Sequence, residues 1–287
     1  MAIRMRDAGM GLRTTGRVVG SHKNTIAEWE ERFAGQNRDP DAVRPMPRVS
    51  AFEGDDLYTI IGKRTDPSQS SGWTAIIMER GSRFLVDQRC GKKDGTLFKE
   101  VMKGVCRFDR QTKDSAFFSD GERCCGQTLF ERCSEVLRTG QRGRPRHVLP
   151  KGAKVRIKNK GSQKHKRGPK RPKYQAPQPE HPETVQDLRD QEIHANHLEG
   201  QNAATRRRNS AFRRRTNTYA KTTEGLQRTL DVHWISHTFF RHWTTGVVPA
   251  VKLGLRKVPL TVEAILRMRK QLDYEVSRWG ELTNLTP

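Results

Sequence analysis

Three acidic residues stand where carboxylates could take part in chemistry. Asp55, next to Asp56, lies in a strand-like run, Asp120 ends the run AFFSD, and Glu199 lies in HLEGQN. Carboxylate oxygens are the ligands that Mg²⁺ prefers, and two such ions about 4 Å apart assist both oxygens in phosphoryl transfer. Taken singly, each acid has a plainer interpretation as a strand end, a turn residue or a charge on a helix surface. Metal-dependent phosphoryl transfer is therefore a hypothesis that other features must support.

The charge of the chain points to an anionic partner. Its 287 residues carry a net charge of +23, far above the roughly 2–8 charges that keep a small domain soluble. Fifteen Lys and Arg, and no Asp or Glu, fall between Arg138 and Lys173, and RRRNSAFRRR spans 206–215. Runs of one sign are typical of nucleic-acid-binding segments, with a solvated face as the plainer alternative. Nucleic acid is therefore the predicted partner.

Other features exclude several classes of protein. No apolar run approaches the ~20 residues that span a bilayer, and the start MAIRMRDAGMG lacks the apolar segment of a secretory signal. The number of cysteines is odd and no pair has CxxC spacing, which argues against a disulfide scaffold and a zinc finger. The cysteines are Cys90, Cys106, Cys124, Cys125 and Cys133. An intracellular protein without a membrane partner is expected.

A helix-turn-helix is predicted within the first module, residues 1–36. In LRTTGRVVGSHKNTIAEWEERF, Gly20 ends a first short helix and Ser21 can cap a second. The second helix carries one apolar stripe at spacings of three and four, formed by Ile26, Trp29 and Phe33. A plain pair of antiparallel helices is the alternative. Because the start of the second helix enters the major groove in this motif, the predicted DNA contacts are His22, Lys23, Asn24 and Thr25.

The region from residue 37 to 138 predicts a linker followed by a mixed α/β fold. Three prolines mark 37–50 as the linker. Apolar patterns and turn residues then predict a strand at 55–62, a hairpin at 73–88, a helix at 95–106, a strand at 114–120 and a helix at 126–138. This order matches the ribonuclease-H-like fold, although several α/β folds begin in the same way.

The second half is predicted to be helical around a basic insertion. The stretch 138–182 has few large apolar side chains, so it is expected to be mostly disordered and to interrupt a catalytic domain at 51–243. Helices are expected from Thr184 to about 209 and over 223–243. The remaining segment, 244–287, is expected to be a tail with a short helix over 261–276, capped by Thr261.

Four segments together resemble the DDE transposases of the insertion-sequence-one family. EGDDLYTIIG, FFSDG and HANHLEGQNAATRRRNSAFRRRTNTYAK resemble the three signature blocks of that family, and VVGSHKNTIAEW resembles its helix-turn-helix. The third block is the most specific, and the resemblance covers about residues 11–243. Tyr58 stands where tryptophan is common, Gly200 stands where a basic residue is usual, and no cysteine zinc-binding segment precedes the helix-turn-helix.

The resemblance implies a ribonuclease-H-like catalytic core preceded by a small all-α helix-turn-helix. Carried over by position, the catalytic and metal-binding acids are Asp55, Asp120 and Glu199, with Mg²⁺ or Mn²⁺ as the cofactor. The implied reaction is hydrolysis at the element's end, followed by attack of the freed 3′-OH on target DNA. Asn202, one helical turn after Glu199 on the same face, is implied either to support the metal-binding acids or to contact DNA. Further DNA contacts are implied for Arg206, Arg207, Arg208, Arg213, Arg214 and Arg215.

The resemblance also sets the expected partners and place of action. Double-stranded DNA, both the inverted repeats and the target, is the expected partner of a homo-oligomer in a prokaryotic cytoplasm, associated with the nucleoid. The main alternative is a non-catalytic DNA-binding regulator or a decayed transposase. An RNA-binding protein of ribosomal type would account for the basic stretch but not for the ordered acids.

Overall fold

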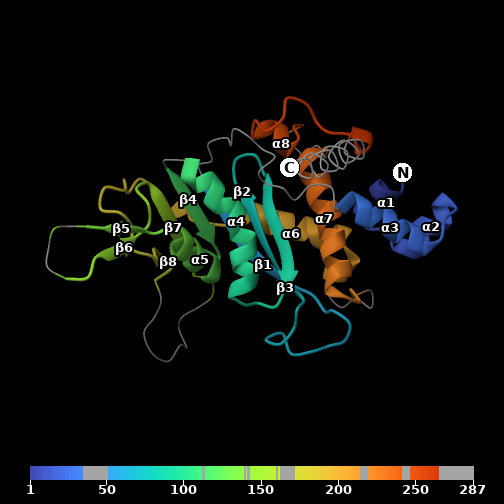
Figure 1. The fold of residues 1–287 in the computed structure, drawn as a ribbon, viewed down its shortest axis with the longest axis horizontal. Helices are drawn as coiled ribbons and strands as arrows, with labels where there is room; N and C mark the ends of the chain where they lie inside the picture. Colours follow the sequence, from blue (N-terminus) through green and yellow to red (C-terminus); the bar gives the residue numbers. More distant parts are fainter. Residues whose placement is uncertain are drawn as a thin grey trace, which may run out of the picture.

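A six-stranded mixed sheet forms the centre of the protein, in a computed structural model that describes residues 1–34, 51–111, 114–138, 140, 143–159, 161, 172–213, 219–240 and 246–264 (Figure 1). The strand order is β3-β2-β1-β4-β7-β8. Helices flank this sheet, so the predicted mixed α/β class is confirmed. Among the described helices, none has the length and apolar character needed to cross a membrane.

The sheet changes from antiparallel to parallel at β1. β1 (Ala51–Tyr58) pairs antiparallel with β2 (Trp73–Glu79), which pairs antiparallel with β3 (Leu85–Gly91). On its other side β1 pairs parallel with β4 (Ser115–Ser119), and β4 pairs parallel with β7 (Ala153–Lys158). The short β8 (Tyr174–Gln175) closes this edge antiparallel to β7. β4 therefore ends beside the middle of β1, where Ser119 is opposite Gly54.

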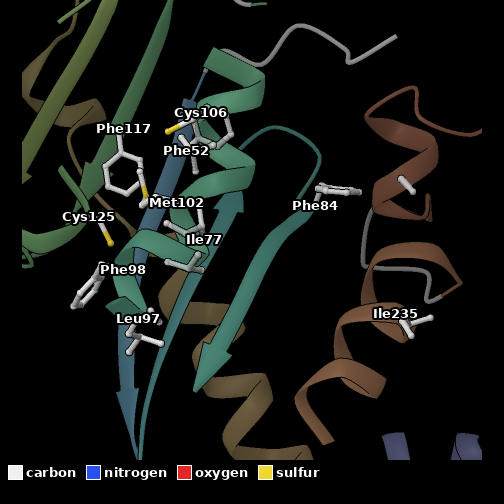
Figure 2. Packing of buried hydrophobic residues seen from close by; sticks show 14 of the residues in the cluster. Phe52, Ile77, Phe84, Leu97, Phe98, Met102, Cys106, Phe117, Cys125 and Ile235 are labelled. Carbon is white, nitrogen blue, oxygen red and sulfur yellow. The ribbon is translucent and has the colours of Figure 1, made fainter. Parts of the chain in front are cut away.

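One face of the sheet is covered by α4 (Gly95–Gln111) and α5 (Cys124–Cys133). Apolar side chains of α4 at three- and four-residue spacing pack onto Phe52, Ile77 and Phe117 of the sheet (Figure 2). Burying each of these side chains stabilises the fold by about 1.5–3 kcal/mol. This core fixes the orientation of β1, because its even-numbered residues must face α4.

The opposite face carries α6 (Asn196–Arg208) and α7 (Thr223–Phe239). Leu57 and Ile76 of the sheet pack there with Leu198, Leu226 and Leu230, joined by Phe212 of a short 3₁₀ turn (Ser210–Phe212). Thr222 caps α7, since its Oγ1 accepts a hydrogen bond from the backbone N–H of Gly225 at 3.0 Å. Val232, Ile235 and Phe239 of α7 belong to the same apolar cluster as the α4 side chains, so α7 contributes to the cores of both faces.

Three helices, α1 (Ala2–Asp7), α2 (Leu12–Val19) and α3 (Lys23–Ala34), form the amino-terminal unit. A three-residue turn joins α2 to α3, and Gly20 adopts the left-handed conformation there (φ 72°) that a side chain would disfavour. The predicted cap is shifted by one residue. His22, not Ser21, directly precedes α3, and its Nδ1 accepts from the backbone N–H of Asn24.

The amino-terminal unit packs against α7 (Figure 1). Glu30 of α3, only 1% exposed, pairs with Arg6 of α1 at 3.0 Å and with Arg228 of α7 at 3.4 Å. Asp7 lies 3.6 Å from Nδ1 of His233, measured from its Oδ1. Buried charged groups therefore hold this interface, although the division into domains stays a prediction.

The basic stretch contains strands, which contradicts part of the expected disorder. β6 (Arg146–Val148) pairs in a projecting hairpin with β5 (Glu135–Leu137), and β7 lies inside the main sheet (Figure 1). β5 precedes the basic stretch and shows that the helix predicted over 126–138 ends at Cys133. Val155 and Ile157 of β7 are at most 1% exposed, while the ammonium of Lys154 pairs with Asp114 and Asp187. The alternation of apolar and basic residues in AKVRIK is that of a strand, and its Lys154 and Arg156 have carboxylate partners.

The other predicted elements agree to different degrees. The hairpin at 73–88, the helix at 95–106, the strand at 114–120 and the helix at 223–243 are confirmed with small shifts. β1 begins at Ala51, so Asp55 lies within the strand. A helix from Thr184 is wrong: a 3₁₀ turn covers Asp190–Glu192, α6 begins at Asn196, and Thr184 Oγ1 accepts from the backbone N–H of Gly152.

Several expectations fall partly or wholly outside the described residues. The carboxyl-terminal segment is described as far as 264, and includes the short helix α8 (Pro249–Lys252). Thr261 Oγ1 accepts from the backbone N–H of Ala264, as predicted for a cap. The predicted linker over 37–50 and the continuation of the last helix to 276 lie outside the described residues.

Two glycine substitutions should have opposite effects on stability. A Cβ at Gly54 of β1 would lie 2.5 Å from Cζ of Phe117, so Gly54→Ala should lower the free energy of unfolding by about 1–3 kcal/mol through overpacking. A Cβ at Gly200, exposed on α6, would meet no atom within 4 Å, so Gly200→Ala should raise it by about 1 kcal/mol. Urea denaturation measures both, and equal shifts would contradict this packing of β1.

Candidate functional site

Asp55 and Asp120 lie on the same face of adjacent parallel strands. Gly54 of β1 is opposite Ser119 of β4, so the next residues of the two strands are Asp55 and Asp120. Side chains alternate along a strand, and Leu57 faces the α6 side of β1, which places Asp55 on that side too. Phe118 of β4 faces the same side of the sheet. Asp120 follows Phe118 by two residues, so it faces this side as well. Both residues are half-buried as a whole, and the two carboxylate oxygens of Asp120 are buried.

A hydrogen bond joins α6 to this edge of the sheet. Nδ2 of Asn202, itself 2% exposed, donates to Oδ2 of Asp55 at 2.8 Å. Glu199 is exposed and precedes Asn202 by three residues, so both lie on neighbouring positions of the helix surface. An ionised carboxylate only accepts, which fixes the amide nitrogen toward Asp55. The helix that carries Glu199 is therefore tied to the strand that carries Asp55.

The three predicted acids do not form a compact cluster of ligand atoms. Within the described part of the chain, the group whose possible ligand atoms all lie within 4.8 Å of one another is Glu53, His194 and His197. The carboxylate oxygens of the three predicted acids do not all lie within this distance of one another. The structure thus places Asp55 within β1, Asp120 directly after the adjacent β4, and Glu199 on the facing helix, without a compact group of their ligand atoms.

Both carboxylate oxygens of Glu53 already have partners within the protein. Glu53 Oε1 accepts from Arg80 Nε at 2.7 Å and lies 2.7 Å from His197 Nδ1, while Oε2 accepts from the backbone N–H of Leu198 at 2.9 Å. Burial, followed by the charge of Arg80, lowers the pKa of His194 and favours its neutral ring. A divalent ion would have to sit beside the guanidinium of Arg80. We therefore interpret this group as an ion-pair network, not as a metal site.

A second charged cluster lies on the opposite face of β1. The ammonium of Lys93 pairs with Asp56 and lies 2.7 Å from Oε2 of Glu122. Burial raises the pKa of Asp56 to about 6, against the lowering effect of Lys93. Burial also opposes ionisation of Glu122, but hydrogen bonds from Lys93 and from the backbone N–H of Cys124 outweigh it and lower its pKa to about 2. Asp56 thus forms an ion pair with Lys93 on one face of β1, whereas Asp55 faces α6 on the other.

The predicted DNA contacts occupy two exposed positions. His22, Lys23 and Asn24 are exposed at the start of α3, and Thr25 is half-buried. At the end of α6, Arg206 and Arg208 are half-buried and Arg207 is exposed, and Arg213 beyond the helix is also exposed. Arg214 and Arg215 lie outside the described residues.

A basic cleft lies between these two positions. It has a volume of about 570 Å³, and α1, the turn after it, α3, α6 and α7 all contribute to its walls. Its cationic lining residues include Arg13, Lys23, Arg208 and Lys221. The α1–α2 turn closes one side, where a Cβ at Gly9 would lie 2.0 Å from the carbonyl oxygen of Arg208. The amino-terminal unit and the end of α6 thus form one positively charged surface.

Sequence reasoning missed the residues that hold α6 in place. Glu53 precedes Asp55 by two residues and therefore shares its face of β1, a relation that the period of a strand could have revealed. Arg80 gave no such signal, because it meets its partner Glu53 only through the folding of the sheet.

Comparisons with known proteins add little to this geometry. No family model matches the chain, and no curated protein matches it in sequence. A crystal structure of a pre-cleavage Mos1 transpososome aligns with TM-score 0.27 and 8% identity over 94% of this chain and 75% of the other. A Mos1 strand transfer complex aligns with TM-score 0.26 and 9% identity over 93% and 75%. TM-scores this low carry no argument about fold or activity.

Proposed function

We propose that this protein is a DNA transposase that cleaves and transfers DNA strands with divalent metal ions. The observation that carries the proposal is the register of β1 and β4, which places Asp55 within β1 beside Asp120 at the end of β4, on the face where α6 carries Glu199 and Asn202. Acids from two strands and a helix that meet at one edge are suited to phosphoryl transfer.

The sheet topology supports a ribonuclease-H-like core as part of this proposal. Three antiparallel strands in chain order are followed by two strands parallel to the first, with the order β3-β2-β1-β4-β7. A helix follows β3 and another follows β4. The proposed fold requires this order of strands. Its last parallel strand is β7, which lies within the basic stretch.

The residues present fit Mg²⁺, or Mn²⁺ in its place. Asp55, Asp120 and Glu199 supply the hard oxygen donors that these ions prefer. Oδ1 of Asn202 is buried, with no hydrogen-bond partner within the described part of the chain, and it belongs to the amide that holds Asp55. The ions would activate the attacking oxygen and stabilise the leaving one. Asn202 orients Asp55, and α6 brings Glu199 to the same face.

The amino-terminal unit and the basic cleft support a DNA partner. The turn between α2 and α3 has the length and the left-handed glycine of a helix-turn-helix. We assign recognition of terminal inverted repeats to His22, Lys23, Asn24 and Thr25, and backbone contacts to the arginines of 206–215. Joining two ends requires at least two copies, so a homo-oligomer on DNA, acting in the cytoplasm at the nucleoid, completes the proposal.

One observation favours a second candidate, a DNA-binding regulator without catalysis. Glu199 is exposed, and the three acids do not form a compact group of ligand atoms. A protein in which these three carboxylates stayed apart would bind DNA through the same basic surface without cleaving it.

A cleavage assay separates the two candidates. Labelled DNA carrying the sequences that flank the coding region is incubated with the full chain in Mg²⁺, in Mn²⁺ and in EDTA. We expect binding in all three and strand cleavage that leaves a 3′-OH only with metal. A fragment with shuffled flanks is the control. Binding of the flanks without cleavage in either metal would support the regulator instead.

A further inference from the structure

The amino terminus of α6 has a tertiary cap. Its own preceding residue, Ala195, provides no side-chain hydrogen bond, so the first turn of the helix has N–H groups to satisfy. Oε2 of Glu53 accepts from the N–H of Leu198, the third residue of the helix, at 2.9 Å. That is the bond an N-cap side chain makes, supplied here by a strand 145 residues away.

The buried charge of Glu53 is fully engaged. Its side chain is 0% exposed, and its Oε1 meets both Arg80 and His197 at 2.7 Å. Arg80 also donates to the carbonyl oxygens of Glu192 and His194, in the segment that leads into α6. Glu53 thus accepts from the N–H of Leu198 in the first turn of α6. Its partner Arg80 donates to two carbonyl oxygens in the segment that precedes the helix.

The two ties between β1 and α6 bracket Glu199. Glu53 binds Leu198, and Asp55 binds Asn202 one helical turn later, so two residues on one face of the strand fix two successive turns of the helix. Glu199 follows the first tie directly. A shift of the helix start would therefore move Glu199 relative to Asp55.

We propose that Glu53 is a positioning residue that sets the distance between Glu199 and Asp55 by capping α6 from β1. This inference rests on the proposed function, because it assigns Glu53 a role in assembling the metal-binding acids. It treats His197 and Arg80 as the partners that keep the buried carboxylate in place, and it assigns no metal to the Glu53, His194 and His197 group.

Mn²⁺ binding to the full-length protein without DNA, followed by electron paramagnetic resonance, tests the inference. Glu53→Gln should raise the Mn²⁺ dissociation constant by about 10–100-fold, as removal of groups that orient metal ligands does. Amide hydrogen exchange at Leu198 should become faster. Asp55→Asn should also weaken binding, because it removes a proposed ligand.

Glu79→Gln is the matched control for a merely structural loss. Glu79 is another buried carboxylate of the same sheet (3% exposed), but it accepts from the Gly81 and Ser82 backbone N–H groups in the β2–β3 turn, not from α6. Glu79→Gln should lower the melting temperature and leave the Mn²⁺ dissociation constant within about twofold of wild type.

The outcomes distinguish this inference from the function it rests on. An unchanged dissociation constant in Glu53→Gln, with weaker binding in Asp55→Asn, would overturn the positioning role and leave the proposed function standing. Binding lost in Glu53→Gln but retained in Asp55→Asn would place the ion at Glu53, His194 and His197 and overturn the inference. Wild-type protein that binds no Mn²⁺ would overturn both.

Discussion

Asp55→Asn should reduce metal-dependent strand cleavage by roughly 10²–10³-fold while leaving end binding near wild type, since removing one preorganised electrostatic group in other sites costs about as much. The substitution keeps the shape of the side chain but removes the charge that faces α6 and accepts from Asn202. Cleavage rates in saturating Mg²⁺, with binding measured separately by titration, give the two quantities.

Asp56→Asn provides the matched control one residue along the chain. Asp56 lies on the opposite face of β1, paired with Lys93, so its loss should change the cleavage rate by less than about tenfold. The same contrast applies at the other strand end, where Asp120→Asn should resemble Asp55→Asn. Similar losses in the Asp55 and Asp56 variants would refute the assignment of the site to the α6 face.

Glu30→Ala should destabilise the contact between the amino-terminal unit and α7 more than other single changes in this unit. Glu30 is 1% exposed and joins Arg6 to Arg228. Removing one partner of a buried ion pair costs about 3–5 kcal/mol, because the remaining charges lose their compensation. We expect a loss of about 3 kcal/mol in the free energy of unfolding, measured in urea.

Glu28→Ala on the same helix is the control for helix propensity and charge. Glu28 is exposed, and surface substitutions usually change stability by less than about 0.5 kcal/mol. Amide exchange in α1 and α3 should speed up in the Glu30 variant only. Equal stability of the two variants would mean that the interface does not depend on the buried carboxylate.

Local patterns in the sequence predicted much of the fold. Gly20 between two short apolar segments predicted the turn before α3, and the runs WTAIIMER and RFLVDQ predicted the β2–β3 hairpin. Both depend on interactions between residues close in the chain. β7 was missed because composition over 138–182 hid a short alternating strand whose Lys154 is buried against distant carboxylates.

The start of α6 was mispredicted for a related reason. The segment from Thr184 has the composition of a helix, but Thr184 bonds to Gly152. The helix begins only at Asn196, where Glu53 accepts a hydrogen bond from the N–H of Leu198. The pairing of Asp55 with Asn202 and the register of Asp55 beside Asp120 likewise arise from strand pairing and helix docking. The acids and Asn202 were visible in the sequence, whereas the roles of Glu53 and Arg80 in holding α6 were not predicted.

The long span between β1 and α6 has a consequence for synthesis of the protein. The contacts of Glu53 with Leu198 and of Asp55 with Asn202 join residues 145 and 147 positions apart. A ribosome therefore finishes α1–α3 well before it delivers α6 and α7. A chain released early would contain α1–α3 without Arg228, the α7 partner of Glu30, and without the α6 wall of the basic cleft, so both the amino-terminal unit and the acidic site depend on the last third of the chain.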